Sequence, residues 1–277
     1  MTRIGDWQGA VGQVWADEWR RTDRSFADLS VALDAAILDA TPADAGQVLD
    51  VGCGAGATTL ALATVRPALT VTGIDVSAAL LAIAKVRAAE GNATNARFLC
   101  GDVTTTLPAN AQYQLICSRH GVMFATDPHV LFARLASVAA PGARLVFSCF
   151  RAATANPWAS ALIAEVTGRS PAAPTDYRPG PFGFADERFV ASLLAAAGWY
   201  NARAQAVDFS YVAGAGPDAL ADATAFFVRI GPVAAAIRDS DLPRALLERR
   251  LAEALTRAYD GETVAFRAAA WLWTANA

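Results

Sequence analysis

The chain has 277 residues and a net charge of −3, so it has no excess of basic residues to support nucleic acid as a partner. It is 54% hydrophobic and 18% charged, which is enough apolar material to fill a large core. No uncharged run approaches the roughly 18 apolar residues of a membrane-spanning helix, and Met1–Asp6 lacks an apolar signal region. These features predict a cytoplasmic protein without an integral membrane segment.

Two helices are expected before the first strand, over about 8–20 and 26–40, because apolar residues recur there at helical spacing. Pro42 follows the second of them and favours its end. Tryptophans are frequent in this segment, and two interpretations stay open for them. They either form an ordinary packing stripe, or residues 1–45 form a lid that excludes water from a ligand site.

Glycines at alternate positions follow the apolar run Val48–Val51, at Gly52, Gly54 and Gly56. This pattern predicts a strand, a tight turn and a helix. Glycine lets a ligand approach the main chain closely, and the start of a helix offers free N–H groups and a partial positive charge. The turn is therefore predicted to bind a nucleotide-like ligand.

Two carboxylates narrow the choice of ligand. The glycine spacing differs from the Gly-x-Gly-x-x-Gly of dinucleotide enzymes, and Asp50, just before the turn, would repel a pyrophosphate but attract an ammonium or a sulfonium. Asp75 ends the next predicted strand, at the distance that suits a ribose diol. A cation that carries a ribose is S-adenosylmethionine.

Strands and helices alternate along the middle of the chain, which predicts a doubly wound parallel sheet of the α/β class. Ser77 is expected to cap the second helix, and Pro128 to begin the third. The expected strands are 47–51, 69–74, 96–100, 113–118 and 143–150, and the helices between them are about 57–66, 78–90 and 127–139. Beyond them we expect helices over about 157–167, 185–197, 217–230 and 241–258, and strands over 203–211 and 263–275.

Several motifs together resemble those of class I S-adenosylmethionine-dependent methyltransferases. They are Val48–Thr59, Gly73–Ser77, Cys100–Val103, Tyr113–Ser118 and Pro141–Phe147, and they cover roughly residues 46–150. The resemblance implies a Rossmann-like sheet of seven strands, the last one antiparallel, with S-adenosylmethionine as cofactor and S-adenosylhomocysteine as product. Ser118–Phe124 and Asn156–Trp158 further resemble a bacterial branch related to quinone C-methyltransferases.

The resemblance also implies roles for individual residues. Asp50 should organise the methionine ammonium, the alternative being a carboxylate that bonds loop N–H groups. Asp75 should bind the ribose, or else only cap a helix, and Asp102 should accept the adenine amino group, or else only shape a turn. The complete predicted cofactor set is Trp15 as a lid contact, Asp50, Gly52, Cys53, Gly54, Gly56, Asp75, Val76, Asp102, Val103 and Ser118.

His120 is the candidate for acid–base work, as a general base near neutral pH. Its alternative is a structural histidine bonded to a loop carbonyl. Arg119 could orient an anionic substrate or hold the lid, and His129 is expected to face solvent. An apolar acceptor pocket could be walled by Phe124, Trp158, Phe182 and Phe184, although plain packing is the safer interpretation of each.

No metal site is expected, because the chain has two histidines and no C-x-x-C pair. The four cysteines are interpreted as small residues buried at strand ends. The chain is thus predicted to divide into a lid over 1–45 and a core over 46–277, with pocket-lining insertions at about 151–183 and 214–260.

The predicted function is methyl transfer to a C, O or N atom of a small organic acceptor, apolar or aromatic. In this reaction the protein positions the acceptor and excludes water. Two alternatives stay open: a nicotinamide-dependent oxidoreductase, and a non-catalytic protein that binds the cofactor. The sequence does not set the oligomeric state, and a homodimer remains open.

Overall fold

A computed structural model describes residues 4–170 and 176–277 of the chain. Its centre is a seven-stranded sheet with the order β3-β2-β1-β4-β5-β7-β6. β7 runs antiparallel to both of its neighbours, and the pairs among β1 to β5 are parallel. This confirms the predicted fold class, a Rossmann-like α/β sheet with its last strand antiparallel.

The strands are β1 (Gly46–Val51), β2 (Leu69–Asp75), β3 (Ala96–Cys100), β4 (Tyr113–Arg119), β5 (Ala139–Phe150), β6 (Tyr200–Gly214) and β7 (Val264–Asn276). The helices of the first half are α1 (Ile4–Gln8), α2 (Ala10–Asp17), α3 (Trp19–Ser25), α4 (Ala27–Ala40), α5 (Ala57–Val65), α6 (Ala78–Glu90) and α7 (Val103–Thr106). Those of the second half are α8 (Pro128–Ser137), α9 (Ser160–Thr167), α10 (Glu187–Ala196), α11 (Ala219–Arg229), α12 (Gly231–Arg238) and α13 (Arg244–Arg257).

The alternation of short apolar runs and helices was read correctly along the core, and Ser77 caps α6 as expected by accepting a bond from the Leu80 N–H. The N-terminal segment differs, because the helix expected over 8–20 is broken into α1, α2 and α3, with Gly9 and Glu18 at the breaks. Two helices of the structure were not predicted. They are the short helix α7, directly after Asp102, and α12.

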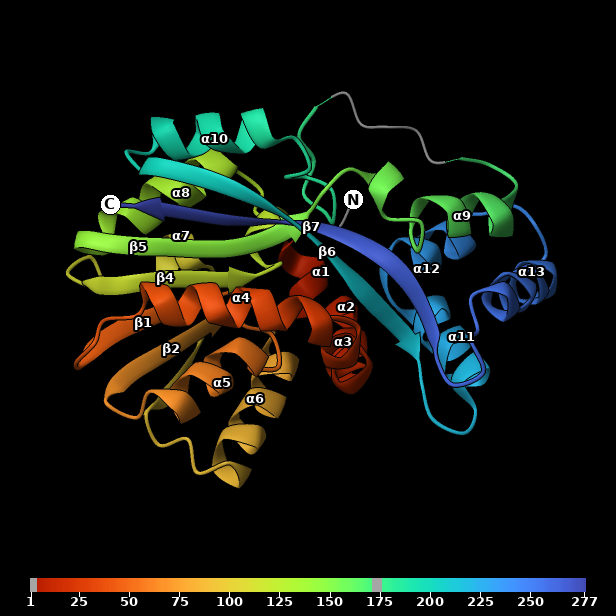
Figure 1. Ribbon diagram of the computed structural model, residues 1–277, viewed down its shortest axis with the longest axis horizontal. Helices are drawn as coiled ribbons and strands as arrows, with labels where there is room; N and C mark the ends of the chain where they lie inside the picture. Colours follow the sequence, from red (N-terminus) through yellow and green to blue (C-terminus); the bar gives the residue numbers. More distant parts are fainter. Residues whose placement is uncertain (1–3, 171–175) are drawn as a thin grey trace.

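Helices cover both faces of the sheet. α4, α5 and α6 lie on one face, while α8 and α10 lie on the other (Figure 1). Leu33 and Ile37 of α4 pack on Val48 and Val146 of the sheet, and these apolar side chains are almost fully buried. Cys53, Cys117 and Cys149 are buried as expected, but Cys100 is exposed, because β3 is an edge strand whose residues are only partly covered.

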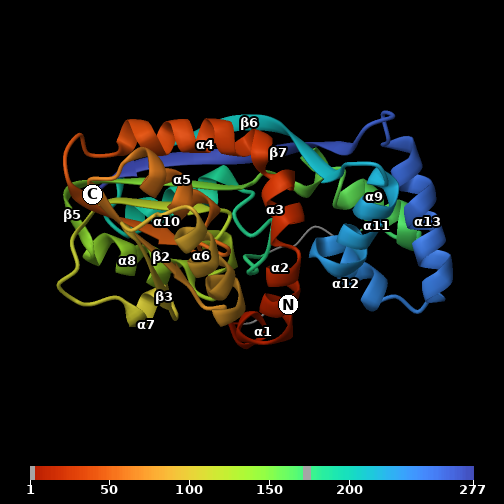
Figure 2. The ribbon, with the colours of Figure 1, turned by 90° about the horizontal axis from the view of Figure 1, so that it is seen from below.

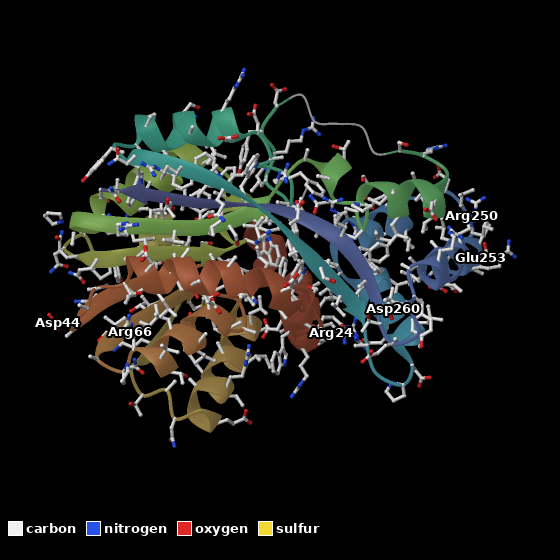
Figure 3. The ribbon with its side chains drawn as sticks, viewed as in Figure 1. Arg24, Asp44, Arg66, Arg250, Glu253 and Asp260 are labelled. Carbon is white, nitrogen blue, oxygen red and sulfur yellow. The ribbon has the colours of Figure 1, made fainter. Side chains whose placement is uncertain are left out.

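The long strands β6 and β7 continue past the other strands and carry a second group of helices, α9 and α11–α13, beyond the carboxyl ends of the parallel strands (Figure 1). α1, α2 and α3 stand between this group and the sheet (Figure 2). Arg24 lies at this central junction, where it donates to the carbonyl of Ala213, whereas Arg66 and Arg250 lie toward opposite ends of the molecule (Figure 3).

Within the described residues, no single helix is long and apolar enough to cross a membrane; α11 and α12 reach that length and composition only as a pair, bent by 66°.

Candidate functional site

A cavity of about 350 Å³ opens at the carboxyl ends of β1, β2 and β4, under the N-terminal helices. Ligands of open α/β sheets bind in this position, because the strand ends and the following turns present main-chain groups there. The predicted cofactor residues on its wall are Trp15, Asp50, Gly52, Cys53, Gly54, Asp75, Val76, Asp102 and Val103. Gly56 and Ser118 are not on the wall that the structure describes.

The glycine turn after β1 needs its glycines for two different reasons. Gly52 has a φ of +66° and lies so close to the loop after β4 that a Cβ would come within 2.9 Å of the Gly121 Cα. Gly54 also has a positive φ, and a Cβ there would meet nothing within 4 Å. Gly56, at the start of α5, has a φ of +83° and packs against α6, where a Cβ would lie 3.0 Å from the Ala84 Cβ. The first two glycines therefore shape the cavity, and the third lets α5 begin.

Asp50 is a buried carboxylate, and one of its two oxygens accepts no hydrogen bond. Oδ2 accepts a hydrogen bond from the Thr59 hydroxyl at 2.6 Å, and Oδ1 is buried with no partner in the described structure. Burial raises the pKa of this carboxyl to about 6, although the Thr59 hydrogen bond and the charge of Arg119 favour the ionised form. A buried acceptor without a donor is costly, so this site suits a ligand that brings an ammonium.

Asp75 fixes the glycine turn from the neighbouring strand. Its Oδ2 accepts from the Gly54 N–H at 2.9 Å, and its Oδ1 accepts from the Ser77 N–H at 2.8 Å. Burial raises its pKa, against the lowering effect of these bonds. Each carboxylate oxygen can accept more than one hydrogen bond, so anchoring the turn leaves capacity for the two hydroxyls of a ribose.

Asp102 and Val103 border the cavity at the end of β3. Oδ1 of Asp102 accepts from both the N–H and the hydroxyl of Thr104, at 2.8 and 2.7 Å. The carboxylate therefore caps α7, and it lines the cavity as well. The two interpretations offered for this residue are compatible.

Ser118 holds the loop after β4 rather than facing the cavity. Its hydroxyl donates to the Val51 carbonyl at 2.7 Å and accepts from the N–H groups of Gly121 and Val122, at 3.1 and 3.2 Å. Its hydrogen-bonding capacity is filled in this way, so the side chain is not available to the methionine end of a cofactor. The predicted side-chain contact with the cofactor is therefore replaced by a structural role, support of the loop.

Arg119 ties the N-terminal helices to the sheet. Its guanidinium lies 2.7 Å from Oδ1 of Asp23 on α3, and Oδ2 of the same carboxylate lies 2.9 Å from Arg87 on α6. Of the two roles considered for Arg119, holding the lid is therefore the one that its contacts favour.

His120 lies in the wall of the cavity, and its ring packs against two aromatic rings. The ring centroids of Phe26 and Phe150 are 4.8 and 4.2 Å away, and Nδ1 lies 2.8 Å from the Ser148 hydroxyl. Burial, helped by the charge of Arg119, lowers the pKa of His120 to about 3, so the ring is neutral at physiological pH. His129 is exposed, as expected.

The N-terminal helices close the cavity on one side. Trp7, Trp15 and Trp19 line it, and the Trp7 ring packs against the rings of Trp15 and Phe124, with centroids 5.5 and 5.2 Å away. A Cβ on Gly12 would lie 2.4 Å from the Ser77 Oγ, so α2 approaches the start of α6 very closely.

The far end of the cavity is aromatic. Trp158 stacks on Tyr211 with centroids 4.6 Å apart and an interplanar angle of 7°, and both residues line the wall together with Phe124, Phe150 and Phe226. Phe182 is set behind Trp158 and Phe150. Phe184 is fully buried in the core against Phe132, in agreement with plain packing, the safer of its two interpretations.

Sequence reasoning missed Phe26, Phe150, Tyr211 and Phe226 as wall residues. They come from α4's start, β5, β6 and α11, which are far apart in the chain. The alternation of Phe209 and Tyr211 identified a strand but could not say what that strand faces. Only the folded arrangement brings these rings together.

Residues 48–142 match the family model described as "Methyltransferase domain". This stretch of the chain is similar to methyltransferase domains. The chain is 35% identical to trans-aconitate 2-methyltransferase of Variovorax paradoxus and 40% identical to release factor glutamine methyltransferase of Bordetella pertussis. These matches cover 36% and 31% of this chain and 36% and 32% of the two relatives, so the chain spans about a third of the length of the curated relatives it matches.

Solved structures with the same fold cover much more of the chain. YcgJ of Bacillus subtilis has a TM-score of 0.58 at 16% identity, over 89% of this chain and 97% of that one. Phosphoethanolamine N-methyltransferase 2 of Haemonchus contortus, in complex with S-adenosyl-L-methionine, has a TM-score of 0.59 at 14% identity, over 100% of this chain and 60% of that one. At these identities the likeness establishes the fold alone.

The residues that line the cavity fit S-adenosylmethionine. S-adenosylmethionine carries an ammonium for the open oxygen of Asp50, a ribose for Asp75 and an adenine for the end of β3. Among residues 4–170 and 176–277, no group of three or more His, Cys, Asp and Glu side chains could hold a metal ion.

Proposed function

We propose that the chain transfers the methyl group of S-adenosylmethionine to a C, O or N atom of a small, apolar or aromatic acceptor by in-line displacement. The observation that carries the proposal is the unpartnered, buried Oδ1 of Asp50, placed beside a turn with no side chains at Gly52 and Gly54. A cation-bearing ligand satisfies this oxygen, whereas the pyrophosphate of a nicotinamide cofactor would be repelled by it.

The cofactor is placed along the strand ends in the order of its parts. Its methionine end lies against Asp50 and the glycine turn, its ribose against Asp75, and its adenine between Val76 and Asp102, with the Val103 N–H directed at the ring. Trp15 covers it from the N-terminal helices α1, α2 and α3, which form the lid. These placements are supported by the position of each residue on the cavity wall.

The character of the acceptor follows from the charges at the far end of the cavity. Among the described residues that line the cavity, the arginine is Arg119, and Asp23 already neutralises it. A polycarboxylate such as the trans-aconitate named in one relative would lack a free cation here, whereas an aromatic body would pack on Trp158 and Phe150. Quinone-like acceptors fit this description, in keeping with the resemblance of 118–124 and 156–158.

Both insertions into the core contribute to this end of the cavity. Trp158 and Pro181 come from the segment 151–183, and Phe226, Ile230 and Pro232 come from 214–260. The insertions therefore supply the acceptor pocket, and variation in them would change the acceptor without changing the cofactor site.

Calorimetry with S-adenosylhomocysteine tests the proposal directly. The wild-type protein is expected to bind it, and Asp75→Ala to weaken binding by about tenfold through lost charge-assisted bonds to the ribose and a looser glycine turn. Asp44→Ala, which removes an exposed carboxylate, is the matched control and should bind normally. No binding by the wild type, together with binding of reduced nicotinamide cofactor in a fluorescence titration, would favour an oxidoreductase. Transfer of labelled methyl groups to an acceptor distinguishes an enzyme from a non-catalytic binder.

Binding of S-adenosylhomocysteine is expected to weaken as the pH falls below about 6. The pKa of Asp50 is about 6 in the ligand-free protein, and only the ionised carboxylate attracts the ligand's ammonium. Below this pH the carboxyl must lose a proton before it binds, so affinity should fall by up to about tenfold for each further pH unit. Calorimetry from pH 5 to 8, with folding checked by circular dichroism, measures this; an affinity that is constant over the range contradicts it.

A further inference from the structure

His120 and Ser148 form a buried pair that the proposed cofactor site does not use. The main-chain N–H of His120 donates to the Ser148 carbonyl at 3.1 Å, and the ring Nδ1 lies 2.8 Å from the Ser148 Oγ. Ser148 is fully buried in β5, and His120 has a φ of +58°, which is uncommon for a residue other than glycine. The ring orientation is therefore held at two points and is not free to change.

The hydrogen bond between His120 and Ser148 indicates which ring nitrogen carries the proton. The Ser148 hydroxyl has one proton to donate, and within the described residues its hydrogen bond is with His120 Nδ1. If Nδ1 carried the proton and donated it, both the serine proton and the lone pair of Nε2 would be buried without a partner, whereas a proton on Nε2 leaves only that N–H without one. The serine therefore donates, Nδ1 accepts, and a neutral imidazole in this state carries its proton on Nε2.

Nε2 is the group that this arrangement leaves open. It is buried and has no hydrogen-bond partner in the described structure. The two nitrogens of an imidazole point in different directions, so Nε2 points away from the Ser148 hydroxyl that Nδ1 faces. The rings of Phe26 and Phe150, which pack against His120, line the cavity with it.

We infer that His120 donates a hydrogen bond from Nε2–H to an oxygen of the methyl acceptor, and that Ser148 is the positioning residue that fixes this tautomer. The inference rests on the proposed function and deepens it, because it identifies the acceptor as an apolar molecule with a carbonyl or enolate oxygen. It also assigns His120 a role other than the general base considered from the sequence. A ring with its proton on Nε2 offers no lone pair there to take a proton.

The surrounding charges keep the ring in this neutral state. Arg119, next to it in the chain, is the charged group that acts on the ring, and it disfavours a second positive charge. Asp23 faces Arg119 and is occupied by it and by Arg87. Tyr211, which is the other titratable side chain packed on Phe26, has its pKa raised by burial and stays neutral as well.

Nitrogen NMR of the labelled imidazoles tests the tautomer without any acceptor. The chain has two histidines, so the exposed His129 gives the second set of signals and serves as the reference. We expect His120 to show a protonated Nε2 and an unprotonated Nδ1, unchanged between pH 5 and 8, and Ser148→Ala to show a mixture of the two tautomers. A protonated Nδ1 in the wild type would overturn the inference.

Binding of two matched probes tests the donor. In the presence of S-adenosylhomocysteine, 1-indanone, which has a carbonyl, is expected to bind about tenfold more tightly than indane, which lacks it. His120→Leu should abolish this preference, and His120→Gln, which keeps an N–H donor, should retain part of it. Equal binding of both probes by the wild type would overturn the inference. Failure to bind S-adenosylhomocysteine at all would instead refute the proposed function.

Discussion

Replacing Asp50 with Asn is expected to weaken binding of S-adenosylhomocysteine by about 100-fold while making the ligand-free protein more stable at pH 8. The loss of affinity follows because a buried carboxylate that meets an ammonium contributes roughly 2–5 kcal/mol, and the amide has no charge. The gain in stability follows because the ionised carboxylate is fully buried and has an oxygen with no partner. The asparagine can keep the bond from Thr59 without that charge.

The sign of the stability change follows from the pKa of Asp50. Burial raises it from 3.8 to about 6 in the folded protein, so the folded state binds this proton more tightly than the unfolded state. The ionised Asp50 therefore destabilises the folded protein. This destabilisation is on the order of 3 kcal/mol well above pH 6, and it disappears as the pH falls toward 3.8. The advantage of Asp50→Asn should therefore be largest at pH 8 and about half as large at pH 5.

Chemical denaturation at the two pH values measures the stability, and calorimetry measures the affinity. Asp44→Asn, at an exposed position, is the matched control and should change neither. A variant that bound S-adenosylhomocysteine as tightly as the wild type would show that Asp50 does not receive the ammonium. Such a result would contradict the interpretation of Asp50 Oδ1 on which the proposed function rests.

Much of the cofactor half of the cavity could be predicted from the sequence, because its signals are local. The turn after β1 needs positive φ at Gly52 and Gly54, and the two acids stand at fixed distances from it. Ser77 signalled the start of α6 in the same way. In such motifs a few neighbouring residues determine the backbone, so a linear pattern carries the information.

The acceptor half could not be predicted, because its residues are brought together only by the fold. Phe26, Phe150 and Tyr211 pack on one another across α4, β5 and β6 with no motif to connect them. The partner of His120 is likewise 28 residues away, at Ser148. Ser118 was predicted to contact the cofactor because it ends a strand beside the site. The sequence could not show that three hydrogen bonds already occupy its hydroxyl.

Replacing Asp23 with Ala is expected to release the N-terminal helices from the sheet. One carboxylate holds two arginines, Arg119 from β4 at 2.7 Å and Arg87 from α6 at 2.9 Å. Arg87 also donates to the Ala55 carbonyl of the glycine turn at 2.7 Å, and its guanidinium lies 4.2 Å from the ring centroid of Trp19. Removing Asp23 leaves two partly buried cations facing each other, so we expect α3 to separate from them.

The consequence should be local opening of the lid rather than loss of the fold. Affinity for S-adenosylhomocysteine should fall by about tenfold, methyl transfer should fall further because water enters the site, and limited proteolysis should cut the N-terminal helices faster. The cooperative unfolding of the sheet should change little, because its core does not include Asp23.

Asp17→Ala is the matched control for this experiment. Asp17 of α2 also pairs with an arginine, Arg229 of α11 at 2.8 Å, but both side chains are more than two-fifths exposed. Exposed ion pairs contribute little, so this variant should bind and be cleaved like the wild type. If both variants open equally, the lid is held by packing of its tryptophans and not by Asp23. If neither opens, α1, α2 and α3 are a fixed wall of the cavity and not a lid.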